Sequence, residues 1–172
     1  KAHQASKIFL EAASQAPDRQ RRRLEMRSAA NLMISGSIRD GMVLLQKVLD
    51  ELKLSYPRSA AAALPSLHAQ RTQLKERGTE FSLSSGPSDP DLLERIDIFW
   101  MAAIGLGAVD YVRAAEFHVR SLLMSLDSGD AYRIARSLAM ESINAAARAP
   151  FQMGRAETLS AAANVLAQQI DH

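Results

Sequence analysis

Apolar residues recur along most of this chain at intervals of three and four positions. The clearest case is the series Ile38, Met42, Leu45, Leu49 and Leu52, which falls on one side of a helix. We find no convincing alternation of apolar and polar residues of the kind that marks a half-buried strand. The pattern therefore predicts an all-α fold.

Proline, glycine and capping residues divide the helical pattern into segments. The expected helices cover approximately residues 2–15, 18–35, 38–56, 58–77, 91–108, 110–128, 130–149 and 154–170. Pro65 leaves two alternatives for the fourth segment, a kinked helix or a helix that starts at Pro65. Residues 79–90, rich in Ser, Gly and Pro, form the one clear loop, and Pro150 and Gly154 mark the last turn.

Small residues recur at loosely similar places in residues 29–48, 100–121 and 138–163. Ala29, Gly41 and Gly105 are examples, and small side chains allow neighbouring helices to approach closely. Repeats of about 34 residues with this feature are typical of tetratricopeptide-type helix pairs. We therefore expect antiparallel helix pairs in an open tetratricopeptide-like solenoid, with a closed irregular bundle as the alternative.

Composition limits the classes of protein to which the chain can belong. With 172 residues, 47% of them hydrophobic, residues 1–172 are expected to form a single helical-repeat domain. The absence of cysteine excludes disulfides, thiolate zinc sites and a cysteine nucleophile. No apolar run reaches the roughly 18 residues that a membrane-spanning helix needs. We expect a cytoplasmic protein that does not contact the membrane.

Charge is distributed unevenly, although the formal net charge is only +2. Residues 1–77 carry 14 basic and 7 acidic side chains, whereas residues 78–172 carry 7 basic and 12 acidic ones. Chance variation in surface composition explains this asymmetry; the alternative is a dipolar molecule that stacks head to tail or binds a partner of mixed charge. The chain starts at Lys1 with residues that already read as helix, so we expect a fragment of a longer polypeptide.

No motif in the sequence indicates an enzyme, a cofactor site or a metal site. The four histidines form no H-x-x-x-H pair, which argues against a metal centre. His118 lies on an apolar helix and is expected to be a partly buried, hydrogen-bonded imidazole. Gly105-Leu106-Gly107 follows a helix rather than a strand, so close helix packing explains it better than a phosphate-binding loop.

Two groups of residues are candidates for an interaction surface. Arg19, Arg23 and Arg27 recur every four positions and therefore line one helical face. Such a face is usually solvated; contact with an acidic partner or another domain is the alternative, and the lack of interleaved aromatic residues disfavours nucleic acid. Asp97 and Trp100 stand in apolar surroundings, where Asp97 is expected to bond a helix end or to pair with an arginine such as Arg95 or Arg136.

Part of the chain resembles a region of large bacterial signalling proteins. The resemblance rests on the segment from about Arg21 to Arg148, which includes LEMRSAANLMISGSIRDGMVLLQKVLDELKLSYP, RIDIFWMAAIGLGAVDYVRAAEFHVRSLLMSL and DAYRIARSLAMESI. In those proteins a Ser/Thr kinase domain and an AAA-type ATPase module precede a tetratricopeptide-like helical region. The resemblance implies that this chain belongs to that last region, which is thought to mediate interaction or sensing. Because the kinase motifs are absent here, kinase activity does not transfer to this chain.

Two hypotheses follow for the function. The first is a non-catalytic module that binds protein, whether a peptide, another domain of the parent chain or a second copy. The second is a regulatory domain whose helices enclose a small ligand that controls the attached kinase. A concavity with an apolar lining and convergent polar groups would favour the second hypothesis.

Overall fold

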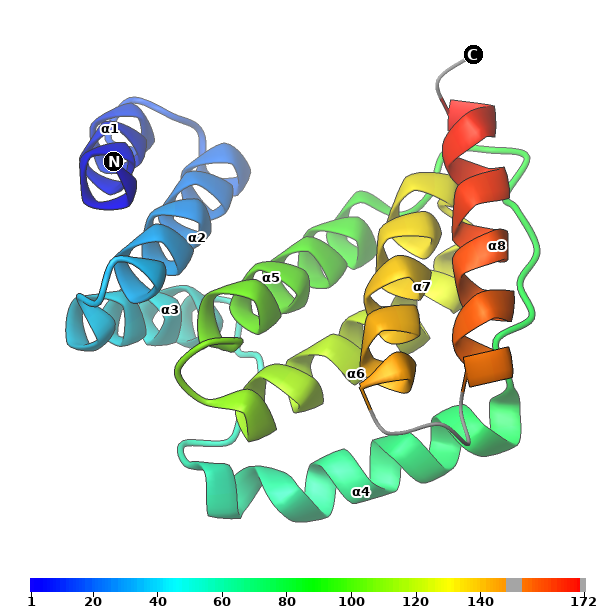
Figure 1. Ribbon diagram of the computed structural model, residues 1–172. Helices are drawn as coiled ribbons and strands as arrows, with labels where there is room; N and C mark the ends of the chain where they lie inside the picture. The colour runs from blue at the N-terminus through cyan, green and yellow to red at the C-terminus, as the bar shows by residue number, and fades with distance from the viewer. Residues whose placement is uncertain (148–152, 171–172) are drawn as a thin grey trace.

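We describe the protein from a computed structural model, which covers residues 1–147 and 153–170. Within these residues the chain forms eight α-helices and no strand (Figure 1). The all-α fold predicted from the periodicity is therefore confirmed. The helices are α1 (Ala2–Ala13), α2 (Asp18–Ile34), α3 (Ile38–Glu51), α4 (Ala60–Arg77), α5 (Pro90–Leu106), α6 (Tyr111–Ser128), α7 (Ala131–Ala146) and α8 (Met153–Ile170).

The third helix ends earlier than the sequence predicts. It stops at Glu51 rather than near Tyr56, and the next residues form a turn. Lys53 takes a left-handed conformation with φ 54°, and the Leu54 amide donates to the Leu49 carbonyl at 2.9 Å. This bond satisfies a free carbonyl at the helix end, so the chain leaves α3 before the apolar pattern stops.

The observed bounds of the fourth helix distinguish between the two alternatives for Pro65. Helix α4 starts at Ala60, where the Ser59 hydroxyl accepts a hydrogen bond from the Ala62 amide at 3.2 Å. The helix then continues through Pro65, so of the two alternatives the start at Pro65 is wrong. The cap lies upstream of the proline and satisfies one of the free amides of the first turn.

The predicted loop is confirmed, and hydrogen bonds connect it to the end of α6 and the start of α5. Residues 78–89 contain no regular secondary structure. The Ser84 amide donates to the carbonyl of Gly129 at 3.0 Å, where φ is +69°. Asp89 caps α5 through the Asp91 amide. The turn expected at Pro150 lies outside the described residues.

Three helical hairpins make up most of the molecule. They are α2/α3, α5/α6 and α7/α8, and α2 also packs against α5 (Figure 1). Helix α1 packs on α2. Helix α4 packs mainly against α6 rather than against its neighbours in the chain, α3 and α5, so the helices do not all pack in sequence order. The helix pairs are compatible with a solenoid or with a bundle, and the tetratricopeptide-like repeat stays a prediction.

Helix α6 joins two hydrophobic cores. One core lies among α2, α3, α5 and α6 and includes Phe99 and Phe117, whose ring centres are 5.8 Å apart. The other lies among α4, α6, α7 and α8 and includes Leu122 and Ile134. Because α6 contributes to both, it fixes α5 and α7 relative to each other, and these two helices form part of the site described below.

Two of the small residues singled out in the sequence lie at close helix contacts. A β-carbon on Gly41 would come within 2.8 Å of the Ala29 carbonyl oxygen, and one on Gly105 would come within 3.0 Å of Ala30 Cα. Gly41 therefore brings α3 close to α2, and Gly105 brings α5 close to α2. Close packing at Gly105 is thus confirmed, whereas Gly107 makes only ordinary contacts.

We expect Gly41→Val to lower the free energy of unfolding by about 1–3 kcal/mol, because backbone cannot move aside as a flexible side chain can. Urea denaturation followed by circular dichroism measures this change. Gly86→Val is the control, because nothing lies within 4 Å of a β-carbon at that position. Equal losses in the two variants would show that the α2–α3 contact is not tight.

Candidate interaction groove

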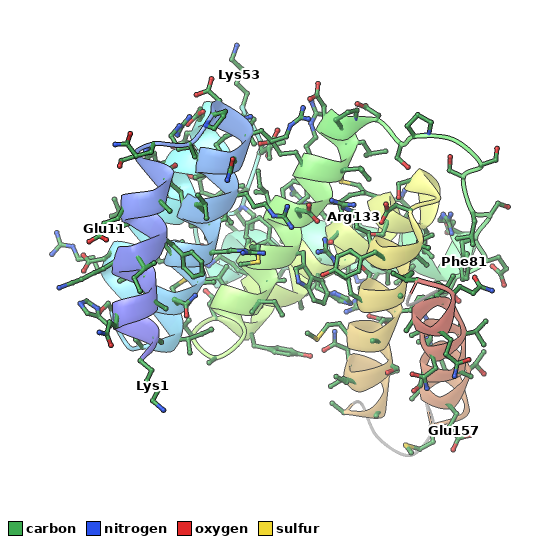
Figure 2. The ribbon with its side chains drawn as sticks, turned by 90° about the horizontal axis from the view of Figure 1, so that it is seen from above. Lys1, Glu11, Lys53, Phe81, Arg133 and Glu157 are labelled. Carbon is green, nitrogen blue, oxygen red and sulfur yellow. The ribbon has the colours of Figure 1, made fainter. Side chains whose placement is uncertain are left out.

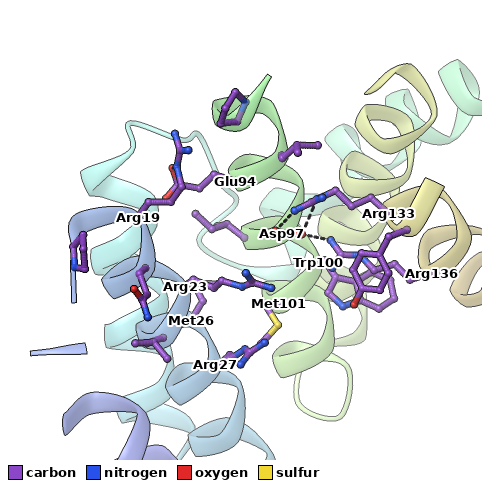
Figure 3. Close-up of a pocket in the computed structure, with 17 residues that line it drawn as sticks. Arg19, Arg23, Met26, Arg27, Glu94, Asp97, Trp100, Met101, Arg133 and Arg136 are labelled. Carbon is purple, nitrogen blue, oxygen red and sulfur yellow. Dashed lines mark hydrogen bonds and ion pairs between the residues drawn. The ribbon is translucent and has the colours of Figure 1, made fainter. Parts of the chain in front are cut away.

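A groove with a volume of about 730 Å³ lies between α2, α5 and α7 (Figure 3). All five residues that the sequence singled out, Arg19, Arg23, Arg27, Asp97 and Trp100, line it. The structure therefore brings together two candidate groups that lie some 70 positions apart in the chain. The full lining is Pro17, Arg19, Gln20, Arg23, Leu24, Met26, Arg27, Pro90, Leu93, Glu94, Asp97, Ile98, Trp100, Met101, Tyr132, Arg133 and Arg136.

The α2 wall of the groove carries the predicted row of arginines. Arg19 is held at the rim by Asp91 at 2.5 Å and by Glu94 at 3.3 Å, both on α5. Arg23 and Arg27 are exposed, and no carboxylate of the described residues pairs with either. Arg27 stands over the ring of Phe9, with its guanidinium carbon 5.9 Å from the ring centre. Of the three arginines, only Arg19 therefore has a carboxylate partner among the described residues.

The neighbouring arginines of the same run have a structural role. Arg22 donates to Glu94 at 2.7 Å and to Glu51 at 3.1 Å, and Arg21 donates to Glu51 at 2.6 Å. The hydrogen bond from Arg21 is the main reason that the pKa of Glu51 lies below its usual value. These bonds tie α2 to α3 and α5. The basic run therefore divides between holding the fold and facing the groove.

Asp97 connects α5 to α7 across the other end of the groove. It accepts hydrogen bonds from Arg133 Nε at 3.0 Å and from Arg136 at 2.5 Å (Figure 3). The sequence analysis named two arginines as examples of a partner for Asp97, and pairing with one of them, Arg136, is confirmed. The other, Arg95, is exposed and does not pair with Asp97. Figure 2 shows Arg133 in the middle of the molecule, between these helices.

Trp100 is the only tryptophan in the chain, and it lies in this groove. The guanidinium carbon of Arg136 is 4.9 Å from the Trp100 ring centre and 5.2 Å from that of Tyr132. Both contacts are within the range of a cation–π interaction. A ligand that disturbed Arg136 or covered the indole would therefore change the fluorescence of a single, located reporter.

Several groove residues were not found by reasoning from sequence. Arg133 is the most important of them, because it makes a two-bond contact with Asp97. Its spacing of three positions from Arg136 places both on one helical face, and this signal could have revealed it. Glu94 has the same spacing from Asp97, whereas Met101 and Tyr132 carried no comparable signal. Their place in the groove follows from how α5 and α7 pack on α6 and α2.

A second polar cluster, outside the groove lining, joins α4, α6 and α7 around the buried carboxylate of Glu141. Glu141 of α7, only 1% exposed, accepts hydrogen bonds from Arg71 of α4 at 2.7 Å and lies 3.2 Å from His118 Nε2 of α6. Burial raises the pKa of Glu141, but the hydrogen bond from His118 and the charge of Arg71 outweigh it and hold the pKa at about 2. The hydrogen-bonded imidazole expected at His118 is thus confirmed, but the side chain is more deeply buried than expected. Its Nδ1 has no partner in the described part of the chain.

The groove can bind anions and apolar groups together. Its lining contains five arginines against two carboxylates, with Leu24, Leu93, Trp100 and Met101 among the apolar side chains. The described residues hold no group of three or more His, Cys, Asp or Glu that could bind a metal. No helix in residues 1–147 and 153–170 has the length and apolar character needed to cross a membrane.

Comparison of the chain with protein-family models, with curated proteins and with solved structures finds no match. The resemblance to kinase-associated helical regions therefore stays a prediction.

Proposed function

We propose that this chain is a non-catalytic protein-interaction module, and that the α2/α5/α7 groove is its binding surface. The observation that supports this most directly is the combination of unpaired cations with apolar side chains in one concave surface. Peptide segments carry both kinds of group, and helical grooves commonly recognise them. The resemblance stated above adds the context of a bacterial signalling protein, with other domains of the parent chain among the possible partners.

Selection from an unbiased peptide-display library tests this function. We expect enriched peptides that bind the protein and the Arg39→Gln control, whose exposed side chain lies outside the groove. They should not bind the variant Leu24→Gln/Leu93→Gln, which removes apolar groove contacts without changing the charge. Failure to enrich any peptide, or equal binding to the groove variant, would refute the proposal.

A domain that senses a small ligand is the second candidate, and the size of the groove favours it. Its volume of about 730 Å³ falls within the range of small-molecule sites, roughly 300–1,000 Å³. A thermal-shift screen of charged metabolites tests this reading. A stabilising compound whose effect is lost in Leu24→Gln/Leu93→Gln, together with no enriched peptide, would replace the first candidate with the second.

A further inference from the structure

The charges in the groove are not equally open to a partner. Arg133 and Arg136 both pair with Asp97, and Arg19 pairs with two carboxylates at the rim. Arg23 and Arg27 pair with no carboxylate among the described residues. Both extend from α2 toward α5, as Figure 3 shows. The positive charge that is free to meet a ligand is therefore concentrated on these two side chains.

The spacing of these two arginines sets the spacing of the groups that they can bind. Four residues of α-helix rise about 6 Å along the axis. In an extended peptide, side chains two positions apart lie on the same side and are separated by about 6.6 Å. Two acidic residues with one residue between them therefore match Arg23 and Arg27, one carboxylate for each guanidinium.

The residue between the two acids would point away from the arginines of α2 and toward α5, which lies between α2 and α7 in Figure 3. On this α5 wall, Met101 and Trp100 line the groove. The carboxylate of Asp97 on the same wall is already paired with two arginines, so it does not present free negative charge. An apolar side chain is the group that suits this wall.

We infer that the partner of the groove is an extended peptide segment with the order acidic, apolar, acidic. The two carboxylates bind Arg23 and Arg27, and the apolar side chain packs on Met101 and Trp100. This inference rests on the proposed function, because it names the partner class of the same groove. The net positive lining, five arginines against two carboxylates, attracts such a segment and repels basic ones.

Titration with defined peptides, read by Trp100 fluorescence, tests the inference. The probe is acetyl-Ser-Asp-Leu-Asp-Ser-amide, and the comparison peptides replace both acids with asparagine, both acids with lysine, or the leucine with serine. Only the probe should bind in the concentration range tested, and added salt should weaken it. Arg23→Gln and Arg27→Gln should each weaken binding by about tenfold, because each removes one charge-assisted hydrogen bond. Arg39→Gln should bind as the unchanged protein does.

The outcomes separate this inference from the proposed function. If display selection yields groove-dependent peptides that lack the acidic pattern, the module stands and the inference is wrong. Equal binding of the aspartate and asparagine peptides would also overturn the inference. Unchanged affinity in the Arg23→Gln/Arg27→Gln double variant, with circular dichroism showing intact helices, would place the acidic peptide elsewhere. If neither selection nor titration detects a peptide, both proposals fail together.

Discussion

Replacing Glu141 with glutamine is expected to lower the free energy of unfolding by about 3–5 kcal/mol, because it leaves a buried cation without its counter-charge. The carboxylate is buried among α4, α6 and α7, where Arg71 and His118 both contact it. A neutral amide at this place leaves the Arg71 guanidinium, itself largely buried, without its counter-charge. Helix α4 should then lose its main polar link to α7.

Urea denaturation of Glu141→Gln measures this loss, and Glu157→Gln is the matched control. Glu157 is exposed on α8, and Figure 2 shows it at the edge of the molecule. The control should stay within about 0.5 kcal/mol of the unchanged protein. A similarly small effect at Glu141 would mean that the buried cluster does not contribute to holding the helices together.

The same cluster gives a defined dependence on pH. The pKa of Glu141 in the folded protein is about 2, below its ordinary value of 4.5. The native state therefore favours the ionised carboxylate, and this stabilisation is complete above pH 4.5. It is lost as pH falls from 4.5 towards 2. The difference in unfolding free energy between the protein and Glu141→Gln should shrink across this interval, and a constant difference would contradict the assignment.

Asp97→Asn is expected to lower the free energy of unfolding by about 1.5–3 kcal/mol, the range for hydrogen bonds to charged groups. The substitution leaves the positively charged Arg133 and Arg136 close together without the carboxylate that compensates their charges. Because Arg136 also stacks on Trp100, its movement should shift the tryptophan emission. Stability and fluorescence should thus change together.

Asp91→Asn is the control for this prediction, because it changes the same residue type on the same helix. Asp91 is exposed, and its ion pair with Arg19 is at the surface, where such pairs contribute about 0–1 kcal/mol. Its tryptophan emission should stay unchanged. If both variants lost the same stability, the Asp97 contacts would have no more weight than a surface ion pair.

Most helix positions could be read from the sequence, because the signals for them are local. The apolar stripe in residues 38–52 is encoded within the helix that it forms. Gly36, with φ +90°, ends α2, and Asp130 caps α7 by accepting from the Arg133 amide, so both act within a few residues of their own positions. The predicted end of α3 near Tyr56 was wrong, because the apolar pattern continues past Glu51 although the backbone turns at Lys53. The sequence did not decide whether α4 starts before Pro65 or at it, because proline also favours the first position of a helix.

The row of arginines on α2 could likewise be predicted, since a spacing of four places side chains on one helical face. The sequence could not predict which of these arginines face the groove. Arg23 and Arg27 do so, whereas Arg21 and Arg22 bind neighbouring helices. Which of several adjacent charges finds a partner depends on where α3 and α5 bring their carboxylates. Sequence spacing carries no information about contacts across 30 or 70 positions.

Local sequence thus accounted for the helices, the loop, the small residues at close contacts and the candidate faces. The tertiary structure alone decided that α4 packs on α6, that Arg133 joins Arg136 at Asp97, and that the candidate residues meet in one groove. The physical reason is that helix formation and capping depend on neighbours within about four residues. Helix packing and ion pairing between helices depend instead on the shape and charge of surfaces that only the folded chain brings together.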